Sequence, residues 1–364
     1  MPDFLTILFA MMTGLLVLDS HSPARAEQIV ESQQQDCTPA NGLEFLCGPR
    51  NVEDMIRLPG RAALIGSSSL GPGAPTGPAA QSGKLYFIDT RARAYVQLVP
   101  DISGKPQSEY SACPGAPNVV KFSPHGIAIR RGSQGHHLLY VVNHGGRESI
   151  EMFTVNVATS IGLKWIGCVI LPDGALGNGV VPLRDGGFVA TKFIDTRHGN
   201  MLDQLAALEK TGAVYRWRPG KGFTTLPGSV MSGNNGVETS ADGKWLFVDV
   251  WPEKRIVRFA LDGDVAPVSI PLDFLPDNIH RMPDDSLLIA GQSGDIQALS
   301  LRYKLQQPID WVVAWLDPQN LRVIPLLREK GTPVFSNVSG AAQVGNALWL
   351  GSVHGDRVAI KLLP

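Results

Sequence analysis

Asp242-Gly243-Lys244-Trp245-Leu246-Phe247-Val248 is a turn followed at once by a short apolar strand. Asp-Gly favours a tight turn, and a short apolar run bounded by turn residues is typical of a buried strand. The same pattern returns five times, at 59–66, 137–143, 185–191, 284–290 and 345–351. The average spacing is somewhat above the ~40 to 50 residues of a four-stranded propeller blade, as expected for a radial array with a few long loops. We therefore predict an all-β fold, a six-bladed β-propeller with four-stranded blades.

Most of these strands are followed by a second strand of alternating character, as in 255–261, which ends at the hairpin signal Asp262-Gly263. One segment departs from this pattern. Apolar residues in 201–210 follow helical spacing, so we predict a short amphipathic helix there that packs over a loop or covers a substrate mouth.

The N-terminus resembles an export signal. The apolar run from Phe4 to Leu18 is shorter than the roughly 20 residues that span a bilayer, and the A-x-A cleavage pattern follows at Ala24-Arg25-Ala26. We expect a signal peptide over 1–26 and a secreted or periplasmic protein; the alternatives are a retained anchor or a misplaced start codon, because no Lys or Arg precedes the apolar run. We predict a loose arm over 27–46 and a single propeller domain over 47–364.

The composition is that of an ordinary globular protein. The formal net charge is -1 and 44% of residues are hydrophobic, which argues against nucleic acid or an anionic membrane as the main partner. Four cysteines form an even set that an exported protein can pair. We expect a Cys37–Cys47 disulfide, whereas Cys113 and Cys168 are either a second disulfide or two buried thiols.

The sequence lacks the motifs of several common kinds of catalytic and cofactor-binding site. The sequence lacks C-x-x-C and H-E-x-x-H, so a tetrahedral zinc site is excluded. It also lacks a phosphate-binding P-loop, a dinucleotide-binding glycine pattern and the G-x-S-x-G of serine esterases.

Short loops rich in Asn, Asp and Gly precede apolar strands at 176–180, 233–237 and 276–279. Each loop alone is best interpreted as a turn. Three such loops in equivalent positions of successive repeats suggest a shared binding site, because a propeller brings its innermost strands to one central channel. Amide and carboxylate oxygens meeting there are suited to calcium, which takes six to eight oxygen ligands in flexible geometry.

Phe122-Ser123-Pro124-His125-Gly126-Ile127, together with 139–144 and 150–153, resembles the paraoxonase family of arylesterases and lactonases. Further segments follow in register from about Cys47 to the C-terminus, namely 52–59, 178–181, 235–244, 275–279 and 340–344. The resemblance implies a catalytic calcium ion at the hub, held by Glu53, Asn178, Asn235, Asp277 and Asn278. It also implies a histidine dyad, with His125 as general base and His144 as its partner.

The chain departs from this family at three places. Gly179 stands where the family's second, structural calcium site has an acidic residue, although Asp54, another ligand of that site, is present; we therefore expect one calcium ion. Lys192-Phe193-Ile194-Asp195 replaces a stretch that supplies part of the substrate wall and a proton-relay acid. The C-terminal cysteine that closes the ring in animal members is absent, so we expect strand pairing to close it.

The resemblance predicts hydrolysis of a small lactone or aryl ester, with a metal-polarised carbonyl attacked by water. His125 is the expected base, and Asp277 or Glu53 is the alternative. Two other functions stay open: a gluconolactonase-like hydrolase of sugar lactones, and a non-catalytic propeller that binds a ligand or protein. No membrane partner is required, and the oligomeric state is not predicted.

Overall fold

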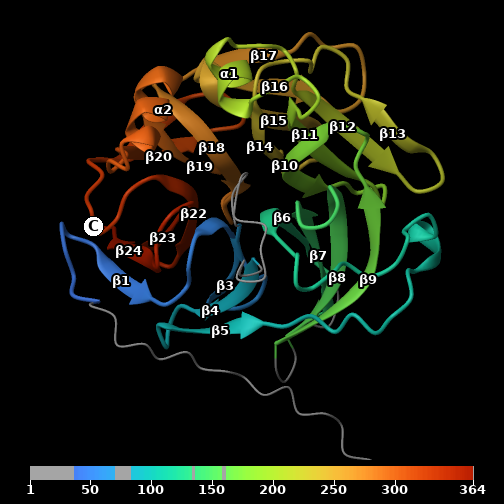
Figure 1. Cartoon of the computed structure of the whole chain (residues 1–364), viewed down its shortest axis with the longest axis horizontal. Helices are drawn as coiled ribbons and strands as arrows, with labels where there is room; N and C mark the ends of the chain where they lie inside the picture. The colour runs from blue at the N-terminus through green and yellow to red at the C-terminus, as the bar shows by residue number, and fades with distance from the viewer. Residues whose placement is uncertain (1–36, 70–82, 133–135, 158–160, 364) are drawn as a thin grey trace, which may run out of the picture.

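Six four-stranded antiparallel sheets surround a central axis in the computed structural model of the chain (Figure 1). The structure describes residues 37–69, 83–132, 136–157 and 161–363. The expected signal peptide, 1–26, and the first part of the expected arm, 27–36, lie outside the described residues. The predicted all-β propeller with six four-stranded blades is confirmed.

In blades one to five the four strands follow the chain from the hub to the rim, and in blade six the rim strand comes from near the N-terminus. Blade one is formed by β2 (Val52–Arg57), β3 (Ala63–Ser68), β4 (Lys84–Asp89) and β5 (Ala94–Leu98). Blade two is formed by β6 (Pro124–Arg130), β7 (His136–Asn143), β8 (Ser149–Asn156) and β9 (Gly162–Ile170). Blade three is formed by β10 (Ala175–Pro182), β11 (Phe188–Asp195), β12 (Ala213–Arg218) and β13 (Gly222–Thr225).

The second half of the ring has the same plan. Blade four is formed by β14 (Asn234–Thr239), β15 (Trp245–Val250), β16 (Arg255–Ala260) and β17 (Val268–Pro271). Blade five is formed by β18 (Phe274–Arg281), β19 (Leu287–Ser293), β20 (Trp311–Leu316) and β21 (Val323–Glu329). Blade six is formed by β22 (Val338–Val344), β23 (Ala347–Ser352), β24 (Arg357–Leu362) and β1 (Glu44–Cys47).

The six apolar repeats of the sequence become the second strand of each blade, β3, β7, β11, β15, β19 and β23. A second strand has a hydrogen-bonded neighbour on each side and packs against adjacent blades on both faces. All eight residues of β11 are accordingly buried. A strand buried on both faces is apolar without strict alternation, which is the pattern that the sequence repeats.

Strand pairing closes the ring. β1, from near the N-terminus, forms the outer strand of blade six beside β24, with Glu44 opposite Ile360 and Cys47 opposite Arg357. The last three residues of the expected arm, 44–46, therefore belong to the propeller. Two disulfides are present, Cys37–Cys47 beside β1 and Cys113–Cys168 between the segment before β6 and strand β9.

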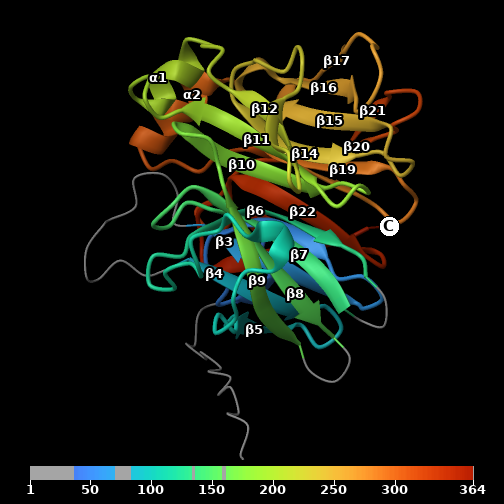
Figure 2. The same ribbon diagram turned by 90° about the vertical axis from the view of Figure 1, so that its right-hand side faces the viewer.

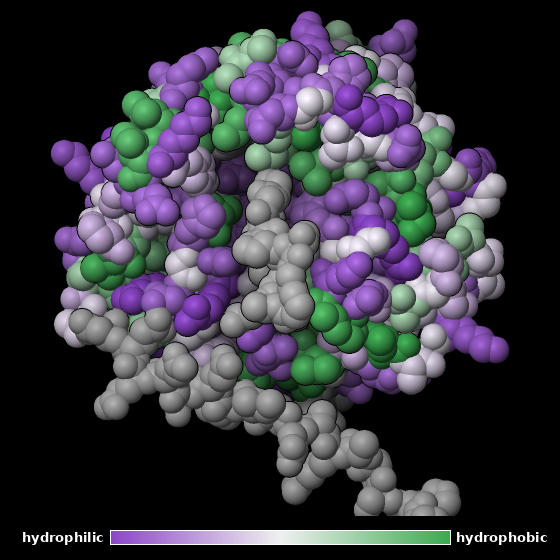
Figure 3. Space-filling model, viewed as in Figure 1, coloured by the Kyte–Doolittle hydropathy of each residue, from purple (hydrophilic) through white to green (hydrophobic). Residues whose placement is uncertain are grey.

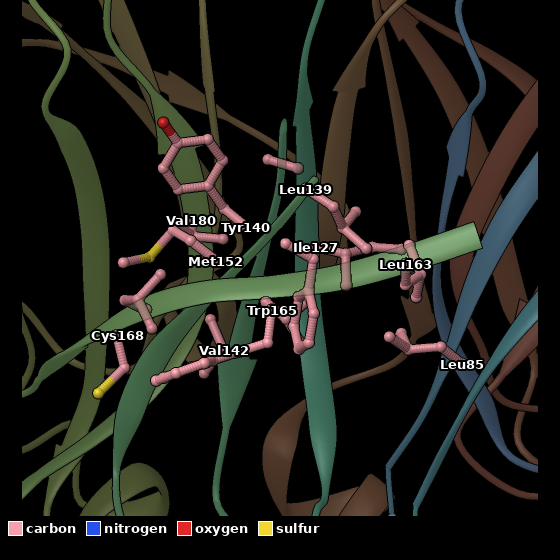
Figure 4. Close-up of a cluster of buried hydrophobic side chains, with 14 of the residues drawn as sticks. Leu85, Ile127, Leu139, Tyr140, Val142, Met152, Leu163, Trp165, Cys168 and Val180 are labelled. Carbon is pink, nitrogen blue, oxygen red and sulfur yellow. The ribbon is translucent and has the colours of Figure 1, made fainter. Parts of the chain in front are cut away.

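The hydrophobic core lies between neighbouring blades. Its largest cluster combines Leu85 of blade one, Ile127 and Trp165 of blade two, and Val180 of blade three, all at most 3% exposed (Figure 4). Each sheet thus packs on the next around the ring. No helix in the described ranges is long and apolar enough to cross a membrane.

Two α-helices, α1 (Met201–Ala206) and α2 (Ile296–Lys304), lie on one face of the ring (Figures 1 and 2). α1 confirms the predicted helix but is shorter, because Leu208 adopts a left-handed φ of 53°. Leu205 of α1 packs with Phe193, Trp251 and Leu299 of α2 in one apolar cluster. On this face, hydrophobic residues lie in small groups among hydrophilic ones (Figure 3).

Candidate active site at the hub

Every innermost strand carries a β-bulge, and in five of the six strands a predicted site residue lies within it. The pairing of these strands with their neighbours shifts register between Val52 and Asp54, Pro124 and Ile127, Gly177 and Val180, Asn234 and Val237, Pro276 and Ile279, and Val338 and Gly340. The residues within these shifts include Glu53, His125, Asn178, Asn235, Asp277 and Asn278. A bulge leaves a residue out of the ladder and redirects its side chain. The Asn-rich segments are therefore bulged strands at the hub, not the turns that each one alone suggests.

The bulges of successive blades touch each other. A Cβ atom on Gly126 would lie 2.1 Å from the carbonyl oxygen of Asn178, and one on Gly236 would lie 2.6 Å from that of Asp277. Because a Cβ cannot approach an oxygen this closely, glycine at these positions lets the backbones of neighbouring blades meet. The contacts bring residues far apart in the sequence into one ring.

Side chains from three blades form hydrogen bonds with each other at this ring. The amide nitrogen of Asn235 donates to Asp277 Oδ1 at 2.9 Å, and that of Asn278 donates to Glu53 Oε1 at 2.7 Å. Gln292 on β19 donates to Asp277 Oδ2 at 2.7 Å. Asn178 makes no side-chain hydrogen bond with the other members within the described part of the chain. All five predicted ligands are at most 7% exposed.

Three of the five predicted ligands keep an oxygen atom that is buried and has no partner among the described residues. These atoms are Glu53 Oε2, Asn178 Oδ1 and Asn235 Oδ1. Both carboxylate oxygens of Asp249, on the neighbouring strand β15, are in the same condition. Unsatisfied buried acceptors are costly, by about 1–3 kcal/mol each and more when charged. A bound cation would satisfy these oxygen atoms, because it needs several oxygen ligands that are not already accepting hydrogen bonds.

Carboxyl groups lie close together at the hub. Burial and the charge of Glu53 raise the pKa of Asp277 to about 7. Burial and the nearby Asp277 raise the pKa of Asp249 well above its usual range. Both carboxyls therefore resist ionisation unless a positive charge is nearby.

The two predicted histidines are in contact. His125 Nδ1 lies 2.6 Å from His144 Nε2, and the rings meet edge to face. The other nitrogen of His125, Nε2, lies 3.2 Å from Glu53 Oε1. Burial alone would lower the pKa of His125, but the charge of Glu53, its hydrogen bond to His125, and the charges of Asp277 and Asp54 together outweigh burial, so the pKa is raised. The dyad is thus joined directly to the candidate metal ligands.

Glu148 is a third member that the sequence did not reveal. Both of its carboxylate oxygens lie 3.0 Å from His144 Nδ1, and Oε2 also accepts from the Gly177 amide at 3.2 Å. The family's relay acid is missing from the segment that contains Phe193, and Glu148 brings a carboxylate from another blade. Its spacing of four from His144, in the link between β7 and β8, carried no helical signal that would have identified it.

The donor set at the hub fits calcium. In the described ranges, no three His, Cys, Asp or Glu side chains converge to hold a metal ion by themselves. The candidate set instead combines the carboxylates of Glu53 and Asp277 with three asparagine amides. Neutral and anionic oxygens of this kind suit a hard cation, and the unpartnered oxygens of Glu53, Asn178 and Asn235 are the atoms that such an ion would satisfy.

A second ion beside Asp54 does not fit these residues. Asp54 Oδ1 accepts from His280 at 2.6 Å and from the Met55 amide at 2.7 Å, while Oδ2 accepts from the Ile127 amide at 2.9 Å. Burial disfavours protonated His280, but the charge and hydrogen bond of Asp54, together with the charges of Glu238 and Glu53, outweigh burial and raise the pKa of His280. Protein donors therefore occupy both oxygens of Asp54.

The altered wall segment is built differently from an open polar wall. Lys192 Nζ lies 2.8 Å from Asp195 Oδ2, and both side chains are at most 10% exposed. Phe193 packs against Trp251 with ring centroids 5.9 Å apart. Trp251 in turn donates to Gln292 at 2.8 Å, and Gln292 holds Asp277. The apolar cluster under the helices is thus connected to the hub.

Solved structures share this fold at low sequence identity. The gluconolactonase XC5397 from Xanthomonas campestris has a TM-score of 0.52 and 16% identity, over 88% of this chain and 89% of its own. The calcium-binding protein regucalcin from Agrobacterium tumefaciens has a TM-score of 0.52 and 13% identity, over 88% and 93%. A luciferin-regenerating enzyme has a TM-score of 0.52 and 12% identity, over 88% and 95%. At these identities the likeness concerns the fold alone.

Sequence comparison extends further. A search of curated proteins finds no match. The model of the Arylesterase family matches residues 32–354, which covers five of the six blades completely and most of the sixth. The chain belongs to the arylesterase family.

Proposed function

We propose that the protein is a calcium-dependent hydrolase of lactones or aryl esters, with its active site at the hub. Membership in the arylesterase family supports an ester- or lactone-hydrolysing enzyme that acts on small molecules. The observation that carries the calcium is the group of unpartnered buried oxygens of Glu53, Asn178 and Asn235 beside His125. When bound, calcium would polarise the substrate carbonyl and stabilise negative charge on its oxygen.

Hydrogen bonding assigns the protons of the histidine pair. Glu148 can only accept, so His144 carries a proton on Nδ1 and leaves its Nε2 as an acceptor. His125 then donates from Nδ1 to His144. In this neutral form the lone pair of His125 is on Nε2, and when Nε2 takes up a proton it donates to Glu53 Oε1, 3.2 Å away, which favours the protonated form.

His125 Nε2 is therefore the proposed general base. It takes a proton from water as the water oxygen adds to the carbonyl carbon, and it returns the proton to the leaving alcohol oxygen as the ester bond breaks. His144 and Glu148 hold the imidazolium formed in between, as the third member of a catalytic triad does. Asp277 or Glu53 is the alternative base.

We also propose that the protein acts outside the cytoplasm. Its two disulfides are compatible with a secreted or periplasmic location, because disulfides persist in oxidising compartments.

The test is hydrolysis of phenyl acetate, δ-valerolactone and gluconolactone, together with the melting temperature, before chelation, in EDTA and after calcium is restored. We expect activity and melting temperature to fall in EDTA and to recover with calcium. Asn235→Ala should lose both responses, whereas the exposed turn variant Asn346→Ala should retain them. His125→Gln should keep the calcium-dependent melting temperature while losing roughly 100-fold or more in activity.

Each other outcome has a definite meaning. Full activity in Asn235→Ala contradicts a metal at the hub. Hydrolysis confined to gluconolactone would identify a sugar lactonase. A melting temperature indifferent to EDTA, with no substrate hydrolysed, would identify a binding propeller.

A further inference from the structure

A cavity lies at the mouth of the central channel that is opposite the candidate active site. Its volume is about 800 Å³, and it is lined by the last residues of the innermost strands, including Arg57, Arg130, Glu238 and His280, and by the turns that follow them. Glu53 and His125 are instead the second residues of β2 and β6. Because the innermost strands run side by side along the channel, their starts and ends mark opposite mouths. The proposed active site does not line this cavity.

Positive charge dominates the lining of this far cavity. Six arginines face four carboxylates: Arg57, Arg130, Arg131, Arg184, Arg216 and Arg281 against Asp185, Glu238, Asp262 and Asp285. Most of the carboxylates are already paired. Arg216 holds Asp185 at 3.0 Å and Asp262 at 2.9 Å, and Arg281 lies 3.6 Å from Asp285.

The remaining arginines are uncompensated. The side chains of Arg57, Arg130 and Arg131 form no ion pair or hydrogen bond with any residue in the described ranges, and that of Arg184 donates to the carbonyl of Ala241. Glu238 cannot neutralise them all: it is one carboxylate, and it accepts from the amides of Thr239 and Arg281. The cavity thus keeps an excess of positive charge.

Within the described part of the chain, Arg57 lacks a hydrogen-bond acceptor for one specific atom. The Nε of Arg57 is buried and has no partner among the described residues. A buried charged donor without an acceptor is destabilising, so an incoming acceptor is favoured there. The planar guanidinium fork matches the paired oxygens of a carboxylate or a phosphate, and such bonds are charge-assisted.

We propose that the far cavity binds the oxyanion group, phosphoryl or carboxylate, of a small molecule distinct from the substrate. Arg57 and Arg130 extend from the ends of neighbouring innermost strands, while Arg131 and Arg184 lie in the turns at the cavity rim. The hub is separated from this ligand by the Asp54–His280 pair, since His280 lines the cavity and donates to Asp54. The ligand therefore enters from the face opposite α1 and α2.

The test is calorimetric titration of the calcium-loaded full chain, dialysed free of excess calcium, with inorganic phosphate and, separately, with acetate, at constant ionic strength. We expect saturable binding of at least one probe. Arg57→Gln should weaken it about tenfold or more, since one charge-assisted hydrogen bond is lost. Arg131→Gln is exposed and serves if Arg57→Gln does not fold, and Arg322→Gln, an exposed arginine outside the cavity, is the matched control.

The outcomes separate this site from the hub. Anions held by a hub cation would lose binding in Asn235→Ala and keep it in Arg57→Gln, and that result overturns the proposal. No saturable binding of either probe also overturns it. Binding of phosphate alone, acetate alone or both supports it and identifies the oxyanion class. Phenyl acetate hydrolysis should be unchanged in Arg57→Gln, so this inference can fail without the proposed function failing.

Discussion

Glu148 is the residue on which the proposed proton chain depends. Its carboxylate fixes the His144 tautomer, which fixes that of His125. In Glu148→Gln, the amide can donate to His144 Nδ1 and select the opposite tautomer. We expect kcat to fall roughly 10- to 100-fold with little change in KM.

Three comparisons check this prediction. Glu148→Asp should recover part of kcat, because it restores a carboxylate. Glu109→Gln, at an exposed site in the link before β6, should leave kcat unchanged. An unaltered kcat in Glu148→Gln would remove Glu148 from the proton chain.

Asp195 should contribute to stability in a pH-dependent way. Hydrogen bonds from Arg197, at 2.6 and 2.8 Å, and from Lys192 hold the pKa of Asp195 well below its usual range. A depressed pKa adds stability that is complete above the unfolded-state value of about 4 and is lost as pH falls through the folded value. Urea unfolding should therefore show Asp195→Asn destabilised by roughly 2 kcal/mol at pH 6, with the difference from wild type shrinking below about pH 4.

The exposed partner Asp173 provides the comparison for that measurement. Asp173→Asn should change stability by less than about 0.5 kcal/mol, since its ion pair with Arg197 is exposed to solvent. A pH-independent difference between wild type and Asp195→Asn would contradict the assignment.

Some residues of the candidate site could be predicted from the local sequence, and others could not. The positions of Asn178, Asn235, Asp277 and Asn278 were predictable because an oxygen-bearing residue stands in the same position of successive repeats, and these residues lie in equivalent bulges. Glu53 was proposed from the family resemblance alone. Glu148 and His280 were not predictable as partners of His144 and Asp54. Their contacts depend on how loops and blades meet, which no local spacing encodes.

The secondary structure elements show the same division. The six second strands were predictable, since burial on both faces imposes an apolar run. The bulges were not: Asn-Gly favours a turn locally, but pairing with the neighbouring strand keeps 234–239 in the sheet. Helix α2 was also missed, although Asp295 caps it by accepting from the Ala298 amide at 2.7 Å.

The two disulfides should stabilise the protein unequally. They close separations of 10 residues for Cys37–Cys47 and 55 residues for Cys113–Cys168. Loop-closure entropy grows with length, so replacing both cysteines by serine should cost about 3 kcal/mol for the first pair and about 4 kcal/mol for the second. Denaturant unfolding of the two double variants checks the order, and a larger loss at Cys37–Cys47 would contradict it.

The whole ring depends on β1. Leu43 and Leu46, next to and within this strand, are 6% and 8% exposed, and the backbone pairs along β24. A chain that begins at residue 48 leaves β24 as a free edge, whereas one that begins at residue 37 retains the pairing. We expect the free energy of unfolding of the shorter chain to be lower by at least about 3 kcal/mol, because two buried leucines are lost. Equal stability would show that strand pairing at blade six does not close the ring.

At the level of the whole molecule, the order of blades was predictable from the repeat alone, but the two mouths of the channel were not. One mouth carries the His125–His144 pair and the other carries the arginines, and this difference appears only when the starts and ends of six strands are brought together.

Calcium binding to the intact protein tests the hub most directly. After chelation and dialysis, calorimetric titration should detect one calcium ion per chain for the wild type, since Asp54 is already held by His280 and by backbone amides. Glu53→Gln, which removes one of the two ligand carboxylates, should weaken the binding at least tenfold. A wild-type protein that binds no calcium, or a Glu53→Gln variant that binds it equally well, would contradict the account.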